Sequence, residues 1–230
     1  MISERKQFIL NTIVNEYLKT AQPVSSGYLV KKYNLDISPA TVRNEMMELE
    51  DDGFIYQPHT SSGRIPTELA YRLVLEDIKS KKREKSLKET EIKLLDNAFN
   101  GEEDSFRQTA KLIAELADSA VFWAFHKNDL YYTGLSNLFS QPEFKQTTAV
   151  YDVSSIIDRL EEIIDEIFED LAEGEQILIG EDNPFGNFLS TALVKYKHNN
   201  SHGILGILGP MRMNYERNLA LVEYIKKKFE

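Results

Sequence analysis

The chain has 230 residues, 42% of them hydrophobic and none of them cysteine, which favours packed domains and excludes disulfides, cysteine-ligated zinc and a thiol nucleophile. Its net charge of −10 argues against nucleic acid, but residues 1–72 hold 8 basic and 9 acidic side chains and can bind duplex DNA if the cations share a face. A signal peptide and a bilayer-spanning segment are both missing, so we expect a cytoplasmic protein with no membrane partner.

The first 75 residues predict three helices followed by a hairpin. Apolar residues at helical spacing predict a first helix, and Ser25 is a good N-cap for a short second one. Ser38 followed by Pro39 is a strong start signal for a third helix. Residues 54–56 and 63–65 then read as two short strands. This order of elements is typical of a winged helix-turn-helix domain.

The remainder predicts a mixed α and β domain behind a charged linker. We expect helices at about 68–78, 105–124, 154–171 and 215–229, and buried strands at 177–179 and 204–208. The run of charges at 79–85 indicates a domain boundary, although a solvated helix face explains it equally well. The predicted fold is therefore α+β, with a DNA-binding domain at 1–75, a connector at 76–103 and a second domain at 104–230.

The third predicted helix has one apolar and one polar side. Val42, Met46 and Leu49 follow the spacing of a core face, and Asn44 lies opposite them. An arginine suits guanine or a phosphate and an asparagine suits adenine, so Arg43 and Asn44 are candidates for DNA contact. A salt bridge to Glu48 or to another neighbour is the alternative for Arg43.

The predicted hairpin adds a second group of candidates. Gly63 permits a tight turn, Ser61 and Ser62 can donate to phosphates, and Arg64 can reach a phosphate or the minor groove. His59 is as readily explained by simple solvation, and Ser25 by pure capping. The full set of predicted DNA-binding residues is Ser25, Ser26, Pro39, Thr41, Arg43, Asn44, His59, Ser61, Ser62 and Arg64.

An enzyme is the main competing class of function. His198 and His202 are four residues apart, as metal ligands on a helix are, but the intervening asparagines indicate a turn between strands. The acidic pairs at 161–162 and 165–166 read as the outer face of a helix. We therefore predict no catalytic residue, no metal site and no cofactor.

The N-terminal segment closely resembles the HrcA-type heat-inducible transcription repressors. The resemblance rests on SPATVRNEMMELEDDGFI running into QPHTSSGRIPTELAYR, of which the PHTSSGRIPT part is the more specific. A second block agrees at residues 134–144, and a third at 179–184 and 203–215. Together these blocks cover most of both ends of the chain.

The resemblance implies a dimeric repressor of chaperone operons with a GAF-like C-terminal domain. Family members bind an inverted-repeat operator, called CIRCE, and the chaperonin helps them hold the active fold. This chain departs from the family after His126, where it omits the first half of the GAF-like domain and an inserted subdomain. We therefore expect a truncated GAF-like domain, either with a smaller sheet or completed by another chain.

A two-fold operator favours a homodimer, and the helix expected at 105–124 is the candidate interface. The predicted interface residues are Ile113, Leu116, Ala117, Ala120 and Val121. The alternative function is a ligand-responsive winged-helix regulator of other genes, with a small molecule bound to the GAF-like remnant. The loss of pocket walls argues against it.

Overall fold

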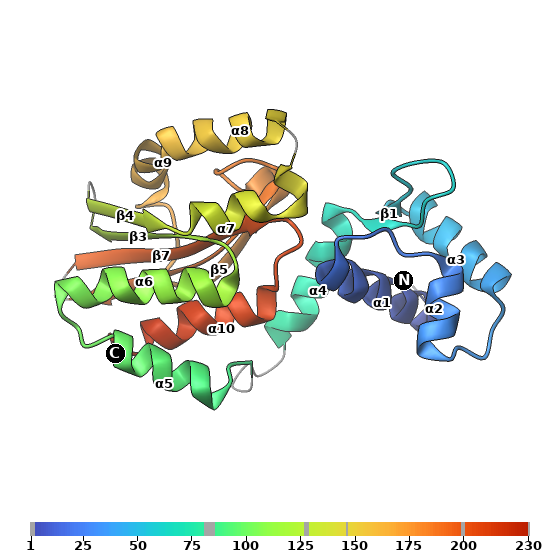
Figure 1. The fold of residues 1–230 in the computed structure, drawn as a ribbon, viewed down its shortest axis with the longest axis horizontal. Coiled ribbons are helices and arrows are strands. Elements are labelled where there is room, and N and C mark those ends of the chain that lie inside the picture. The colour runs from blue at the N-terminus through green and yellow to red at the C-terminus, as the bar shows by residue number, and fades with distance from the viewer. Residues whose placement is uncertain (1–2, 81–85, 127–128, 146, 199–200, 230) are drawn as a thin grey trace. The chain divides into compact units, whose positions relative to one another are not determined.

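The computed structural model describes residues 3–80, 86–126, 129–145, 147–198 and 201–229. The chain divides into two compact units, Met1–Lys81 and Lys82–Glu230, which we call the first and second unit. The division falls inside the charged stretch at 79–85. Figure 1 shows the two units, and each is described by itself.

The first unit consists of helices and one short hairpin. Its elements are α1 (Glu4–Thr20), α2 (Ser26–Tyr33), α3 (Pro39–Asp51), β1 (Ile55–Tyr56), β2 (Ile65–Pro66) and α4 (Glu68–Ser80). The side chains of Ser3, Ser25 and Ser38 each accept a hydrogen bond from the first turn of a helix, so serine capping sets the starts of α1, α2 and α3. The predicted starts of α2 and α3 are thereby confirmed.

The core of the first unit is formed by one face of each helix. Ile9, Leu10, Ile13 and Val14 of α1 are buried, at the spacing that predicted this helix. They share the interior of the unit with the buried side chains Val24, Leu29, Val42, Met46, Leu49, Ile55, Ala70, Tyr71 and Leu75. Three of these residues, Val42, Met46 and Leu49, lie on one face of α3, and the opposite face of the helix is exposed to solvent.

The second unit is built on a five-stranded antiparallel sheet in the order β4-β3-β7-β6-β5. The strands are β3 (Ala120–His126), β4 (Asp129–Thr133), β5 (Gly174–Ile179), β6 (Leu189–His198) and β7 (Ser201–Pro210). The helices are α5 (Glu89–Ala98), α6 (Glu103–Ala117), α7 (Leu135–Ser140), α8 (Thr147–Asp158), α9 (Leu160–Ile167) and α10 (Tyr215–Lys226), with 3-10 turns η1 (Pro142–Phe144) and η2 (Gly180–Asp182).

Helices cover both faces of this sheet. Figure 1 shows α5, α6 and α10 on one side and α7, α8 and α9 on the other. Successive residues of β3 alternate between the two layers. Val121 and Trp123 pack in the first, and Ala120, Phe122 and Ala124 in the second. The Trp123 indole N–H donates to the Tyr196 hydroxyl at 2.6 Å, which satisfies both groups inside the first layer.

The structure overturns the helix predicted at 105–124. α6 ends at Ala117, and Ala120 and Val121 belong to β3. Ile113 is fully buried in the chain's own core, against which Leu116 and Ala117 are partly buried. Ile113, Ala120 and Val121 are thus buried within this chain, whereas Leu116 and Ala117 are only half-buried, so the interface predicted on these five residues stays a prediction.

Three further predictions in this region change. The helix expected at 154–171 is two helices, α8 and α9, separated at Arg159. The closing helix ends at Lys226 instead of residue 229. The predicted connector at 76–103 contains α5, whose Leu95 packs in the core of the second unit. In the described part of the chain, no helix is both long and apolar enough to cross a membrane.

Candidate nucleic-acid interface

The two sides of α3 differ as the sequence predicts. The Ser38 hydroxyl accepts a hydrogen bond from the Thr41 amide at 3.1 Å and begins the helix. Val42, Met46 and Leu49 are buried. On the other side the solvent-exposed residues are Pro39, Ala40, Arg43, Asn44, Met47 and Glu48, with Thr41 half-buried. The first half of α3 therefore presents small and hydrogen-bonding groups to solvent.

Ion pairs connect α3 to α1, and Arg43 takes no part in them. The Arg5 Nε donates to Glu45 Oε1 at 2.8 Å, and the Lys6 Nζ lies 2.5 Å from Glu48 Oε2. Glu48 is thus the partner of Lys6, and the alternative of a salt bridge to Arg43 is wrong. Among the described residues of the first unit, Arg43 is the one arginine without an ion pair.

Glu50, at the end of α3, connects this helix to the hairpin. Its Oε1 accepts a hydrogen bond from the Gln57 amide at 2.9 Å, and its Oε2 accepts one from the Arg64 Nε at 2.8 Å. Arg64 also pairs through its backbone with Val24, with N–O distances of 2.8 and 2.9 Å. Arg64 is therefore half-buried with one side of its guanidinium occupied, instead of extending freely as the sequence suggested.

Gly63 is required for a different reason from the predicted one. The left-handed residue of the loop is Ser61, with φ of 70°. A Cβ at Gly63 would lie 2.4 Å from the Val24 carbonyl carbon and 2.5 Å from its oxygen. A glycine is needed here because the hairpin passes directly over the backbone that precedes α2.

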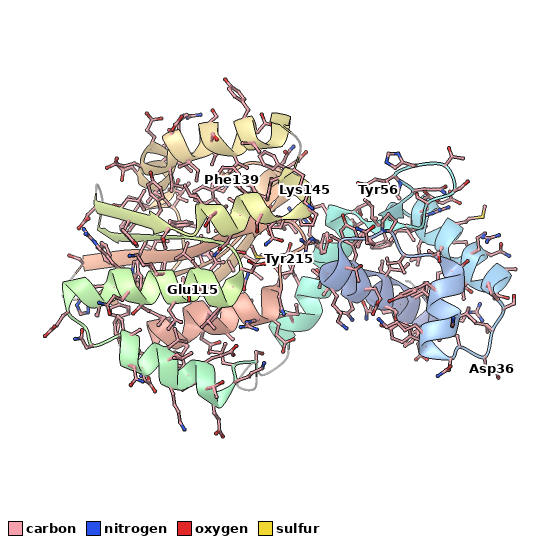
Figure 2. The ribbon with its side chains drawn as sticks, viewed as in Figure 1. Asp36, Tyr56, Glu115, Phe139, Lys145 and Tyr215 are labelled. Atoms are coloured by element: carbon pink, nitrogen blue, oxygen red, sulfur yellow. The ribbon has the colours of Figure 1, made fainter. Side chains whose placement is uncertain are left out.

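The tip of the hairpin is open to solvent. His59, Thr60 and Ser61 are exposed, whereas the Ser62 hydroxyl donates to the His59 carbonyl at 2.6 Å and closes the turn. Tyr56, labelled in Figure 2, is 46% exposed on β1. The tip thus offers a histidine and two hydroxyl groups that no secondary-structure bond occupies.

Six of the ten predicted residues line one cavity of about 430 Å³. They come from the start of α2, from α3 and from the hairpin, and are Ser25, Ser26, Arg43, Ser61, Ser62 and Arg64. The other four, Pro39, Thr41, Asn44 and His59, are not among its lining residues. The structure therefore brings together residues that are up to 39 positions apart in the sequence (Ser25 and Arg64).

A buried carboxylate that connects α1 to α2 was not predicted from the sequence. Glu16 on α1 is 1% exposed and accepts hydrogen bonds from Lys32 Nζ at 2.6 Å, Tyr28 Oη at 2.5 Å and Tyr33 Oη at 2.6 Å. These bonds lower the pKa of Glu16 to about 2 and tie α1 to α2. The sequence signal was an acidic residue three positions after Ile13, on the core face of α1.

The histidines and acidic pairs considered for an enzyme lie on different elements. His198 and His202 lie near the adjoining ends of the paired strands β6 and β7, not on a helix, and the predicted turn at 199–200 falls outside the described residues. Glu161, Glu162 and Glu166 are exposed on α9. Within the described residues no group of three or more His, Asp or Glu side chains is arranged to hold a metal ion.

Comparison with known proteins finds HrcA relatives along most of the chain. A family model described as the HrcA protein C-terminal domain matches residues 41–219. The heat-inducible transcription repressor HrcA of Carboxydothermus hydrogenoformans is 29% identical, over 99% of this chain and 97% of that protein. That alignment runs over 332 positions, more than this chain has residues, so long gaps are opened in this chain.

Other relatives match over a shorter stretch. The HrcA repressor of Natranaerobius thermophilus is 46% identical over 115 residues, and this match spans 50% of the chain but only 34% of that relative. A crystal structure of a hypothetical protein has the same fold, with a TM-score of 0.83 at 19% identity, over 100% of this chain and 98% of that one. Because the family model covers well over half of its residues, the chain belongs to the HrcA family.

Proposed function

We propose that this protein is a transcription repressor that binds operator DNA through α3 and the hairpin β1–β2, acting as a winged helix. The observation that carries the proposal is the solvent-facing first half of α3, beside which Glu50 fixes the hairpin. The curated relatives are named heat-inducible transcription repressors, which agrees with this function.

The chemistry of α3 suits the major groove. In this proposal α3 enters the groove and α2 supports it against the backbone, as in other helix-turn-helix domains. Asn44 is exposed and its amide can bond an adenine at two positions, and Thr41 is half-buried at the end of the helix that enters first. His59 and Ser61 on the hairpin tip reach the neighbouring backbone.

The finer parts of the proposal rest on the family resemblance. They are a homodimer, an inverted-repeat operator of the CIRCE type ahead of chaperone operons, and chaperonin as the modulator. The second unit, as the truncated GAF-like domain, holds the dimer together in this proposal. Adding chaperonin should raise the fraction of protein bound to operator, and an unchanged fraction at every concentration excludes this modulation.

A gel-shift experiment tests the DNA-binding function. Wild-type protein should bind a CIRCE inverted-repeat duplex more tightly than a scrambled duplex of the same composition, at one stated salt concentration. Asn44→Ala should weaken operator binding by about 1–3 kcal/mol and leave scrambled-duplex binding unchanged. Asn97→Ala, an exposed helical asparagine of the second unit, is the matched control. Equal affinity of wild-type protein for both duplexes would exclude specific recognition.

A further inference from the structure

We infer that the cavity between α2, α3 and the hairpin is the binding site for a phosphate group, supplied by one backbone position of the operator. This inference rests on the proposed function and makes it more specific. It gives Arg43 the role of holding backbone phosphate instead of reading a base.

The charges of the cavity favour an anion. Two arginines, Arg43 and Arg64, line it, and none of the described residues lining it is acidic. The Nε of Arg64 is occupied by Glu50, but its two terminal nitrogens have no partner among the described residues. Arg43 has no ion pair in the described part of the unit. Two guanidinium groups therefore converge on one space with donors to spare, which is the arrangement that binds phosphate oxygens.

The hydroxyl group of a mostly buried residue, Ser26, points to the same ligand. Ser26 is 6% exposed and lines the cavity, yet its hydroxyl has no hydrogen-bond partner among the described residues. Ser25 already caps α2, since its Oγ accepts from the Tyr28 amide at 3.3 Å, so Ser26 is not needed for capping. Because the Ser26 hydroxyl oxygen is not itself enclosed, a ligand that enters the cavity can reach it.

The start of α2 adds a backbone donor. The amide of Ser26, which lines the cavity, has no intrahelical acceptor, because Ser26 is the first residue of the helix. The positive end of the helix dipole faces the same side as these two serines. With a volume of about 430 Å³, the cavity is in the range of small-ligand sites (~300–1,000 Å³) and admits a phosphate together with part of the adjoining sugars.

Two substitutions at Ser26 provide a matched test. Ser26→Asp places a carboxylate in the cavity, and Ser26→Asn places a neutral side chain of the same shape there. An acidic residue in the first turn favours a helix, so loss of binding by Ser26→Asp cannot be attributed to unfolding of α2, and circular dichroism checks this. We expect Ser26→Asp to weaken binding to operator and scrambled duplex alike by at least about tenfold, since a carboxylate in the cavity repels the backbone phosphate of either duplex. The affinity of Ser26→Asn for both duplexes should stay within about threefold of wild type, because this variant adds no charge.

The salt dependence of Arg43 variants decides between phosphate and base. Arg43→Ala should weaken binding to both duplexes, and the slope of log K against log salt should fall by about 0.9, the value for one phosphate contact. Arg43→Lys should restore most of that slope, because it keeps the charge. Arg159→Ala removes one positive charge from the second unit and is the control for net charge. An Arg43→Ala effect confined to the operator, with an unchanged slope, would overturn the inference.

A last measurement separates the source of the phosphate. Inorganic phosphate titrated against chloride at constant ionic strength should give no saturable rise in Tm, because a free ion lacks the contacts of the surrounding duplex. A saturable rise that Ser26→Asp abolishes would assign the cavity to a free phosphorylated ligand and overturn the backbone assignment. If wild-type protein binds the operator but Ser26→Asp and Arg43→Ala bind it equally well, only this inference fails. If wild-type protein binds neither duplex, the proposed function fails as well.

Discussion

Replacing Glu16 by glutamine should destabilise the first unit strongly. The carboxylate is 1% exposed and accepts hydrogen bonds from Lys32, Tyr28 and Tyr33. Its pKa falls from 4.5 to about 2, and each tenfold change in proton affinity is worth about 1.4 kcal/mol, so ionisation stabilises the fold by about 3 kcal/mol. We expect Glu16→Gln to lower the unfolding free energy by about this amount at pH 7. Glu4→Gln, an exposed change on the same helix, is the control.

The pH dependence follows from the sign of that pKa change. A carboxyl group with a lowered pKa in the folded state stabilises the protein fully above its unfolded pKa of about 4.5 and loses the contribution as the pH falls toward about 2. Wild-type protein should therefore lose stability over this window, and Glu16→Gln should lose about 3 kcal/mol less over the same window.

Two probes separate the units in this experiment. Hydrogen exchange of peptides from α1 and α2 reports the first unit, where the change lies. The single tryptophan, Trp123, is in the core of the second unit, so its fluorescence during urea unfolding should not change with Glu16→Gln. Wild type and variant with the same acid sensitivity in α1 and α2 would refute the assigned role of Glu16.

Two substitutions test other close contacts. Gly63→Ala should destabilise the first unit by about 1–3 kcal/mol and weaken duplex binding, because its Cβ would overlap the Val24 backbone. Gly27→Ala is the control, since a Cβ there meets open space and should not lower the stability. Equal melting temperatures of these two alanine variants would contradict the proposed close approach. Arg212→Lys should lower the stability of the second unit by about 1–3 kcal/mol, read by tryptophan fluorescence, because a lysine cannot replace the two-nitrogen contact with Glu143. Unchanged unfolding would show that this contact contributes little.

The first unit could be predicted closely because its signals are local. A serine before Pro39 specifies the start of α3 by itself, and the core face of α1 follows from spacing alone. The cavity could not be predicted in the same way. It depends on how Glu50 and Val24 hold the hairpin, and neither contact leaves a pattern in the sequence around Arg64.

The second unit shows where periodicity fails. Ala120, Val121 and Trp123 continue the apolar stripe of α6, so a single long helix was predicted. In the structure both faces of β3 are covered, and a strand buried on both faces is apolar throughout, without the alternation that would distinguish it from a helix. The helix ends at Ala117, and the next residue, Asp118, has a left-handed φ of 49° that allows the chain to turn back into the sheet.

The bonds from Glu50 have a consequence for the energetics of recognition. These bonds fix the spacing between α3 and the hairpin in the absence of DNA. The helix and the hairpin therefore form one preorganised surface. Association then spends little free energy on ordering a loop, and more of the contact energy is retained as affinity. If the proposed interface is correct, such a surface adjusts little to a mismatched groove, and its rigidity then contributes to discrimination between DNA sites.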